Sequence, residues 1–344
     1  MVVDGHRLLK RVFYGSFVFL RRNGMLFEKF LKQFKAMSEE DFKKELREAK
    51  EDAERELILL LYNFYHRHWP KNVYHYTDFS ALEGILCGAG IRLCRSDKMN
   101  DKGELYNFVD LLKKSVSKRF ADDENMLKEI DKRFCDVQQE RKTDICYLAS
   151  FSTWEDDVSQ WERYGNDGFG ISISFDVETL KKISLEKEIA FQEVFYGKNA
   201  DFHQLTDVFE DLFKQKELVR HTFYPNDWKA AFDSTWAVAG AHKQHSFASE
   251  QEFRLLTLPL WNGKRHDNLG ETHIVTTPSG FRECLYLDWK KTCEELKIPY
   301  ENLITKITIG PRSPLTTIEL KEWLNEKGLK CFCDCVTKSE STLR

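Results

Sequence analysis

The stretch VYHYTDFSALEGIL, residues 73–86, predicts a short strand that runs directly into an amphipathic helix. Its first half is rich in aromatic and β-branched residues, which favour strands. In its second half, Phe79, Leu82 and Leu86 recur at helical spacing. His75 lies near the point where the strand gives way to the helix, and strand ends on a rigid scaffold commonly carry ligand-binding groups. We therefore expect the functional domain of the chain to begin here.

From residue 73 onward, short strands separated by helices continue to the C-terminus. We expect strands at 73–76, 91–94, 145–152, 169–175, 189–196, 252–258, 272–277, 282–288, 304–309 and 330–336. We expect helices at 78–87, 102–117, 123–138, 156–164, 177–183, 202–216, 226–244 and 316–327. The strands outnumber those of a βαβ repeat, and short turns separate the later ones. The sequence therefore predicts an α+β fold with split mixed or antiparallel sheets and helical insertions.

The first 70 residues have a different pattern and are predicted to be helical throughout. Apolar residues recur at helical spacing between Phe27 and Phe34, and the helical pattern ends at Trp69-Pro70. We divide the chain into an N-terminal helical region, 1–70, and an α+β domain, 71–344. The helical region either covers the domain by packing against it or offers a surface to a protein partner.

The composition bounds the class of protein. A hydrophobic fraction of 42% allows a sizeable core, and a formal net charge of −4 gives no general attraction to nucleic acid. The odd count of nine cysteines, without the spacing of a disulfide framework, indicates a reducing compartment. The apolar run at residues 12–20 lacks a cleavage pattern and is too short to span a bilayer. We expect a cytoplasmic protein that does not insert into a membrane.

Three alternating cysteines raise the question of a metal site. Cys331, Cys333 and Cys335 would share one face of the strand expected at 330–336. No second cysteine or histidine pair with zinc-type spacing accompanies them. We therefore predict buried strand cysteines and no metal.

Further motifs follow residues 73–86 in a set order. They are Asn100-Asp101 with Glu104, then Ser150-Phe151-Ser152, then Trp161 and Tyr164 ahead of Gly168-Phe169-Gly170, then Lys243 followed by Glu250-Gln251-Glu252-Phe253-Arg254. In this order the chain resembles a widespread bacterial family of unknown function, over about residues 73–344. It departs from that family at Lys102, where the family commonly has proline.

The order of elements is also similar, more remotely, to the ADP-ribosyltransferase fold. This resemblance implies NAD as a substrate and no metal. It also implies that the late glutamates Glu250 and Glu252 carry the reaction. By the same resemblance, the NAD site would contain His75, Tyr76, Thr77, Ser150, Ser152, Trp161, Tyr164 and Arg254.

Chemistry supports a role for two carboxylates at such a site. Cleavage of the nicotinamide–ribose bond develops positive charge on the sugar, and a fixed carboxylate stabilises that charge. Glu250 and Glu252 are two residues apart, so at the start of a strand they would face the same way. We assign Glu252 to the ribose and Glu250 to the nucleophile. The alternative is a solvated strand face with a surface salt bridge. For Trp161 and Tyr164, core packing is favoured over stacking on a ligand.

The sequence thus predicts NAD-dependent ADP-ribosyl transfer to a macromolecular target, or hydrolysis of NAD. The resemblance implies a toxin or an anti-phage defence effector. The charge favours a protein or small-molecule acceptor over nucleic acid. The alternative function is a non-enzymatic ligand-sensing or protein-interaction module of the same fold. If His75, Ser152 and a carboxylate of Glu250 or Glu252 line one cleft, the enzyme is favoured. If they lie far apart on separate faces, the enzymatic interpretation is lost.

Overall fold

The computed structural model of the chain describes residues 44, 69–96, 104–140, 146–196, 206, 209–210, 213–214, 239–257, 267–277 and 280–343. The predicted N-terminal helical region therefore lies almost entirely outside the described residues. The same holds for most of the helices expected at 202–216 and 226–244, and for Asn100 and Asp101.

Aspartates mark the junctions at which three strands end and helices begin. Strand β1 (Asn72–Thr77) leads through Asp78 into α5 (Phe79–Leu86). Strand β4 (Ile171–Asp176) leads into α9 (Val177–Glu186), and β10 (Gly280–Leu287) leads through Asp288 into α12 (Trp289–Leu296). In each case the aspartate side chain accepts a hydrogen bond from the backbone N–H three residues later, which satisfies one of the first amide groups of the helix.

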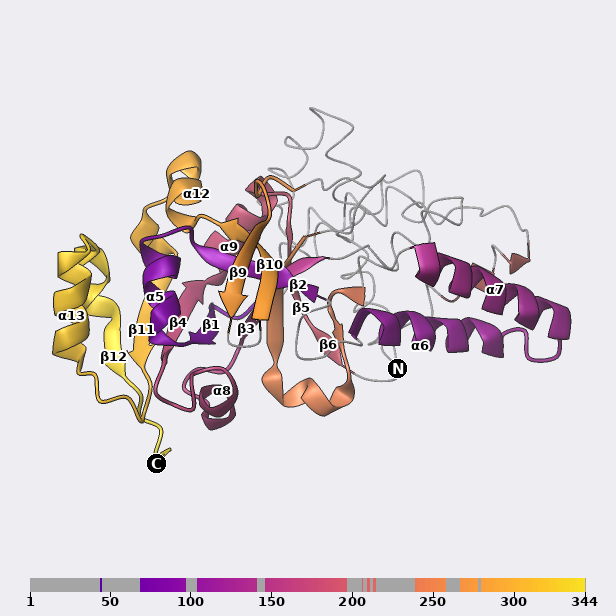
Figure 1. The fold of residues 1–344 in the computed structure, drawn as a ribbon, viewed down its shortest axis with the longest axis horizontal. Coiled ribbons are helices and arrows are strands. Elements are labelled where there is room, and N and C mark those ends of the chain that lie inside the picture. The colour runs from indigo at the N-terminus through magenta and orange to yellow at the C-terminus, as the bar shows by residue number, and fades with distance from the viewer. Residues whose placement is uncertain are drawn as a thin grey trace.

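One branched sheet of ten strands organises the described part of the chain (Figure 1). Its main path runs in the order β12-β11-β4-β1-β3-β2-β10-β9, while β8 pairs with β3 and β5. All of these pairs are antiparallel except β11 with β12. The remaining strands are β2 (Ile91–Arg95), β3 (Tyr147–Ser152), β5 (Ala190–Glu193), β8 (Glu252–Leu256), β9 (His273–Thr277), β11 (Ile304–Ile309) and β12 (Val336–Lys338).

The sheet forks at β3. One edge of β3 pairs with β8 along its length, from Leu148 to Ser152. The other edge is shared: β1 meets it at Ser152, and β2 meets it at Tyr147 and Leu148. The strands β1 and β2 therefore diverge on the same side of β3. The predicted combination of helices with a mixed, mostly antiparallel arrangement of strands is confirmed, although ten of the strands form one branched sheet.

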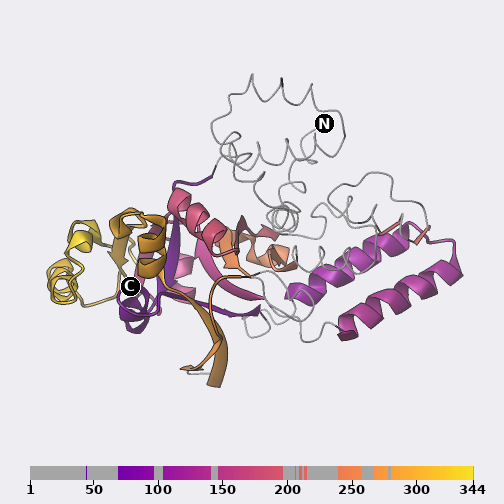
Figure 2. The ribbon, with the colours of Figure 1, turned by 90° about the horizontal axis from the view of Figure 1, so that it is seen from above.

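Several helices lie at the two ends of the fold or are short. Helices α6 (Glu104–Lys118) and α7 (Glu124–Glu140) lie side by side in both views and extend away from the sheet (Figures 1 and 2). Helix α13 (Thr317–Glu326) lies at the opposite end, beside β12 and the 3-10 helix η4 (Lys330–Cys335). Helix α8 (Val158–Arg163) and the 3-10 helix η2 (His245–Glu250) are short, as are η3 (Tyr300–Asn302) and the parallel pair of β6 (Phe195–Tyr196) and β7 (His242–Lys243).

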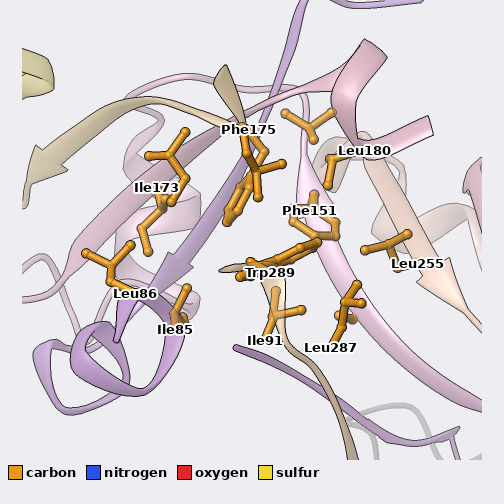
Figure 3. Packing of buried hydrophobic residues seen from close by; sticks show 14 of the residues in the cluster. Ile85, Leu86, Ile91, Phe151, Ile173, Phe175, Leu180, Leu255, Leu287 and Trp289 are labelled. Carbon is orange, nitrogen blue, oxygen red and sulfur yellow. The ribbon is translucent and has the colours of Figure 1, made fainter. Parts of the chain in front are cut away.

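The hydrophobic core lies on one face of the sheet, beneath α5, α9 and α12 (Figure 3). Phe151 of β3 and Phe175 of β4 meet at its centre, with ring centroids 5.5 Å apart, and Trp289 of α12 packs on Phe175 at 5.4 Å. Burying a large apolar side chain contributes about 1.5–3 kcal/mol, so this layer provides most of the driving force for closing the helices onto the sheet. It leaves the opposite face of β3 and β8 for polar residues.

Three elements differ from the sequence prediction. Residues 330–336 are not a strand: Lys330–Cys335 form the 3-10 helix η4, and the strand β12 begins only at Val336. Cys331, Cys333 and Cys335 therefore do not alternate on a strand, and Cys331 is exposed rather than buried. Buried Phe332 anchors the 3-10 turn against Tyr300, a contact that the alternation of cysteines does not reveal.

Helix α12 is the second difference, since no helix is expected from the sequence at residues 289–296. Its apolar residues Trp289, Cys293 and Leu296 do recur at helical spacing. A third difference concerns the helix expected at 226–244, because His242 and Lys243, near its expected end, form β7.

Candidate functional site

Strand β8 places two charged residues on the polar face of the sheet. Glu252 lies opposite Ser152 of β3, and Arg254 lies opposite Ser150. Side chains of a strand alternate between faces, so these four side chains share a face, whereas Phe151 and Phe253 belong to the core. The structure therefore brings together four of the residues that the sequence assigned to the NAD site or to the reaction.

Glu250 reaches the same place by a different route from the one expected. It is the last residue of η2 and not part of the strand. Gln251 then adopts a left-handed conformation with φ of 44°, which turns the chain into β8. Such a conformation is uncommon for a residue other than glycine and must be supported by its surroundings. The expectation that Glu250 and Glu252 share a strand face is wrong, but their carboxylates still converge.

A single ammonium group joins the two carboxylates. Lys243 Nζ donates to Glu250 Oε2 at 2.6 Å and to Glu252 Oε2 at 2.8 Å. Arg254 Nε donates to Glu252 Oε1 at 2.7 Å, and Tyr164 OH donates to Glu250 Oε1 at 2.8 Å. We call these five residues, Tyr164, Lys243, Glu250, Glu252 and Arg254, the carboxylate cluster.

Burial makes the electrostatics of this cluster strong. Glu250 and Glu252 are each 3% exposed, and Arg254 is 1% exposed. Burial alone would raise the pKa of Glu252, but the charges of Arg254 and Lys243 outweigh it and lower that pKa to about 2. Two acidic and two basic side chains balance one another here, as buried charges require.

Two tyrosines complete the polar surroundings. The pKa of Tyr164 is raised, first by burial and then by the negative charge of Glu250, so Tyr164 remains a hydrogen-bond donor at neutral pH. Tyr196 of β6 accepts a hydrogen bond from the backbone N–H of Glu252 at 2.8 Å, and its pKa is raised chiefly by burial. Both groups hold the carboxylates in place without changing the net charge.

One side of the cluster reaches the surface at Glu250. Arg163 Nη1 lies 3.3 Å from Glu250 Oε1, and the Arg163 side chain is 47% exposed. Trp154 is 49% exposed, and its Nε1 donates to the carbonyl of Ser249, next to Glu250. Ser152 Oγ donates to the backbone carbonyl of Glu250 at 2.9 Å. Of the two carboxylates, Glu250 is therefore the one with contacts at the protein surface.

His75 lies elsewhere. Its neighbour Tyr74 is in register with Ser152, so strand alternation places the His75 side chain on the core face, beside Phe151 at a ring distance of 5.7 Å. Its Nδ1 is 2.9 Å from the carbonyl oxygen of Ser150, and since a carbonyl only accepts, Nδ1 carries the proton. Burial lowers the pKa of His75. The structure thus places His75 and the carboxylates on opposite faces of the sheet, so the expectation that one cleft holds His75, Ser152 and a carboxylate is wrong.

The remaining predicted residues support a turn. Tyr76 OH donates to the Trp154 carbonyl at 2.8 Å, and its ring packs edge-on against Trp161 at 4.9 Å. Trp161 is fully buried and donates from Nε1 to Asp156 at 2.7 Å, so its indole offers no face to a ligand in this conformation. Thr77 pairs with Ile171 at the end of β1. These contacts shape the loop that carries Trp154.

Sequence reasoning did not single out Lys243, Arg163, Trp154 or Tyr196 as site residues. Lys243 precedes Glu250 by seven residues in the ordered motifs, but the helix expected at 226–244 gave no reason to place its side chain between the two carboxylates. Tyr196 and Trp154 carry no pattern that distinguishes them from core aromatics.

All five members of the carboxylate cluster lie between Tyr164 and Arg254 in the sequence. Residues 160–255 match the family described as "Protein of unknown function (DUF2971)". The match confirms the predicted resemblance to a family of unknown function over residues 160–255; it does not cover the rest of the predicted extent, about residues 73–344, or the motifs that lie there. The DUF2971 match contains the whole carboxylate cluster and excludes His75. No curated protein and no solved structure matches the chain.

The described part of the chain contains neither a candidate metal site nor a candidate membrane-spanning helix. No three histidine, cysteine, aspartate or glutamate side chains there are grouped so as to hold a metal ion. No helix of that part is long and apolar enough to cross a membrane.

Proposed function

We propose that this chain consumes NAD, either by transferring ADP-ribose to a protein or small-molecule acceptor or by hydrolysing NAD, and that its fold is of the ADP-ribosyltransferase-like type. The observation that supports the proposal most strongly is the convergence of Glu250 and Glu252 on Lys243 at the surface end of a forked sheet. A role as a toxin or anti-phage effector belongs to the same proposal and follows only from the sequence resemblance.

The geometry favours different roles for the two carboxylates from those assigned from the sequence. Both oxygens of Glu252 accept from buried cations, and this carboxylate is held by Arg254 and Lys243. Glu250 contacts the half-exposed Arg163 and lies next to exposed Trp154. In the proposal, Glu250 faces the ribose and stabilises its developing positive charge, while Glu252 positions Lys243 and, through it, Glu250.

In the proposal, the exposed residues Arg163 and Trp154 bind the diphosphate and a ring of NAD. A guanidinium binds phosphate oxygens in a bidentate manner, so Arg163 suits the diphosphate. The exposed indole of Trp154 suits stacking on the nicotinamide or adenine ring. His75 has no direct part in this arrangement, because it lies on the other face of the sheet.

A second function, a non-enzymatic ligand-sensing module, is favoured by two observations. The first is that His75 and the carboxylates lie on opposite faces of the sheet and not in one cleft. The second is the way the charges of the cluster are paired. The side chains of the carboxylate cluster satisfy one another, which is also how a purely structural ion network looks. Such a module would bind NAD or a related ligand at the same surface without releasing nicotinamide.

Binding is the experiment that tests the shared part of both functions. NAD should raise the melting temperature of the purified chain, since a ligand bound only by the folded state stabilises it. Trp154→Ala should reduce that shift, whereas Phe281→Ala, at a residue 78% exposed on the hairpin of β9 and β10, should leave it intact. Absence of any shift and of calorimetric binding at millimolar NAD would overturn the proposal. Mass spectrometry of cells that express the chain would then identify the acceptor, and adducts confined to nucleic acid would contradict the choice of a protein or small molecule.

A further inference from the structure

Two cysteines lie next to each other on neighbouring strands at the other end of the sheet. Cys94 of β2 and Cys284 of β10 are partners in the antiparallel register. Their Sγ atoms are 3.4 Å apart and share a hydrogen bond. The two residues are 190 positions apart in the sequence, so only the fold brings them together.

The strand register already meets the demands of a disulfide. Paired residues of antiparallel strands have Cα atoms about 4.5 or 5.5 Å apart, and disulfides span Cα distances of about 4.4–6.8 Å. Because the two sulfur atoms already face each other, side-chain rotation is sufficient to close the remaining gap to a covalent bond of about 2.05 Å. The backbone of β2 and β10 need not move.

The two thiols differ in solvent exposure, and positive charges act on the more exposed one. Cys94 is half-buried, whereas Cys284 is fully buried. The hydrogen bond from Cys284 lowers the pKa of Cys94, and the positive charges of Arg282 and Arg92 lower it further, although burial opposes them. Both arginines are two residues from a cysteine on the same strand, so they share its face of the sheet. A partly exposed thiol among positive charges has the surroundings of a reactive cysteine.

We propose that Cys94 and Cys284 form a covalent modification site that is oxidised by hydroperoxides. The Cys94 thiolate attacks one peroxide oxygen, the O–O bond breaks, and the products are a sulfenic acid on Cys94 and hydroxide (or alkoxide). The Cys284 thiol then attacks the Cys94 sulfur and forms the disulfide. The oxygen of the sulfenic acid leaves as water, which takes up the Cys284 proton. Two thiols are oxidised by two electrons, and one hydroperoxide is reduced.

The site lies on the same face of the sheet as the carboxylate cluster. Cys94 is in register with Leu148 of β3, and four residues along that strand Ser152 faces Glu252. At about 3.3 Å per residue this separation is about 13 Å, so the dithiol is near the cluster but distinct from it. A disulfide there would join β2 to β10, beside the projecting hairpin of β9 and β10 seen in Figure 2. The inference stands independently of the proposed function.

The test is hydrogen peroxide treatment of the reduced, full-length wild-type chain, followed by unfolding, alkylation and peptide mass spectrometry. The expected result is a peptide pair linked through Cys94 and Cys284, loss of these two thiols, a higher melting temperature, and reversal of all three by dithiothreitol. The proposal is overturned if both cysteines remain alkylatable after exposed Cys331 has been oxidised.

Variants assign the roles of the two sulfurs. Cys284→Ser should leave a sulfenic acid on Cys94 that dimedone traps, and Cys94→Ser should leave Cys284 reduced. The matched control is Cys293→Ser, which removes a buried thiol of α12 whose pKa is raised by burial. This control should form the Cys94–Cys284 link as the wild type does. Equal loss of the link in Cys293→Ser and Cys94→Ser would show a general loss of packing and would contradict a specific site.

Discussion

Replacing Glu252 with glutamine removes one negative charge from the carboxylate cluster and keeps the shape of the side chain. Glu252 is 3% exposed and accepts from Lys243 at 2.8 Å and from Arg254 at 2.7 Å. Breaking a buried ion pair on one side costs about 3–5 kcal/mol. The pKa gives the same scale: a fall from 4.5 to about 2 corresponds to about 3 kcal/mol, at 1.36 kcal/mol per pKa unit. This burial excludes the alternative of a solvated strand face, at which the substitution would hardly affect folding.

Urea unfolding at pH 7 measures this free energy directly. The control is Glu283→Gln, since Glu283 also bonds an arginine and a tyrosine, Arg95 and Tyr147, but is 29% exposed. That substitution should cost about 1 kcal/mol or less. The double variant Glu252→Gln with Lys243→Met restores charge balance and should cost less than the sum of the two single changes. A loss of under about 0.5 kcal/mol for Glu252→Gln would refute the reasoning, because a surface substitution has that effect.

The pH dependence of the same variant follows from the direction of the pKa shift. The pKa of Glu252 in the folded chain lies below its ordinary value of 4.5. Its contribution to stability is therefore fully present above pH 4.5 and is lost as the pH falls towards 2. The difference in unfolding free energy between wild type and Glu252→Gln should shrink over that window.

Two further predictions concern the backbone and His75. Gly170→Ala should destabilise the chain strongly, because the added Cβ would lie 2.1 Å from the Thr77 carbonyl oxygen. Gly84→Ala on α5 is the control and should be neutral or stabilising, because the added Cβ has nothing within 4 Å. Equal melting temperatures for the two variants would contradict this prediction. Burial lowers the pKa of His75, so its contribution to stability is present above pH 6.5 and lost below it. His75→Gln should flatten that pH dependence while still donating to the Ser150 carbonyl, and an unchanged profile would show that His75 does not titrate with folding.

Local patterns were sufficient to predict most of the fold. The strand and helix of residues 73–86 follow from residue type and spacing, and Asp78 caps the helix as such residues do. Helix α12 had the same signals, Asp288 as its cap and apolar residues at helical spacing, and still went unrecognised. Residues 330–336 show the limit of the method, since alternating cysteines fit a strand while the packing of Phe332 makes a 3-10 helix.

The candidate site was harder to predict, because its geometry depends on non-local contacts. Glu250 and Glu252 converge through the left-handed turn at Gln251, which no spacing rule indicates for glutamine. Lys243 joins them from β7, a strand of two residues inside an expected helix. His75 was expected beside the carboxylates from motif order alone, and strand alternation places it on the other face.

Release of nicotinamide from NAD by the purified chain, followed by chromatography, tests the central claim most directly. The wild type and Glu283→Gln should release nicotinamide at similar rates, and Glu250→Gln should be slower by about 10²–10³, the effect of removing one preorganised charge-stabilising group. All three are compared below the melting temperature of the least stable variant, so that unfolding is not mistaken for a lower catalytic rate. The contradicting result is turnover of Glu250→Gln at the wild-type rate, or NAD bound by the wild type with no nicotinamide released.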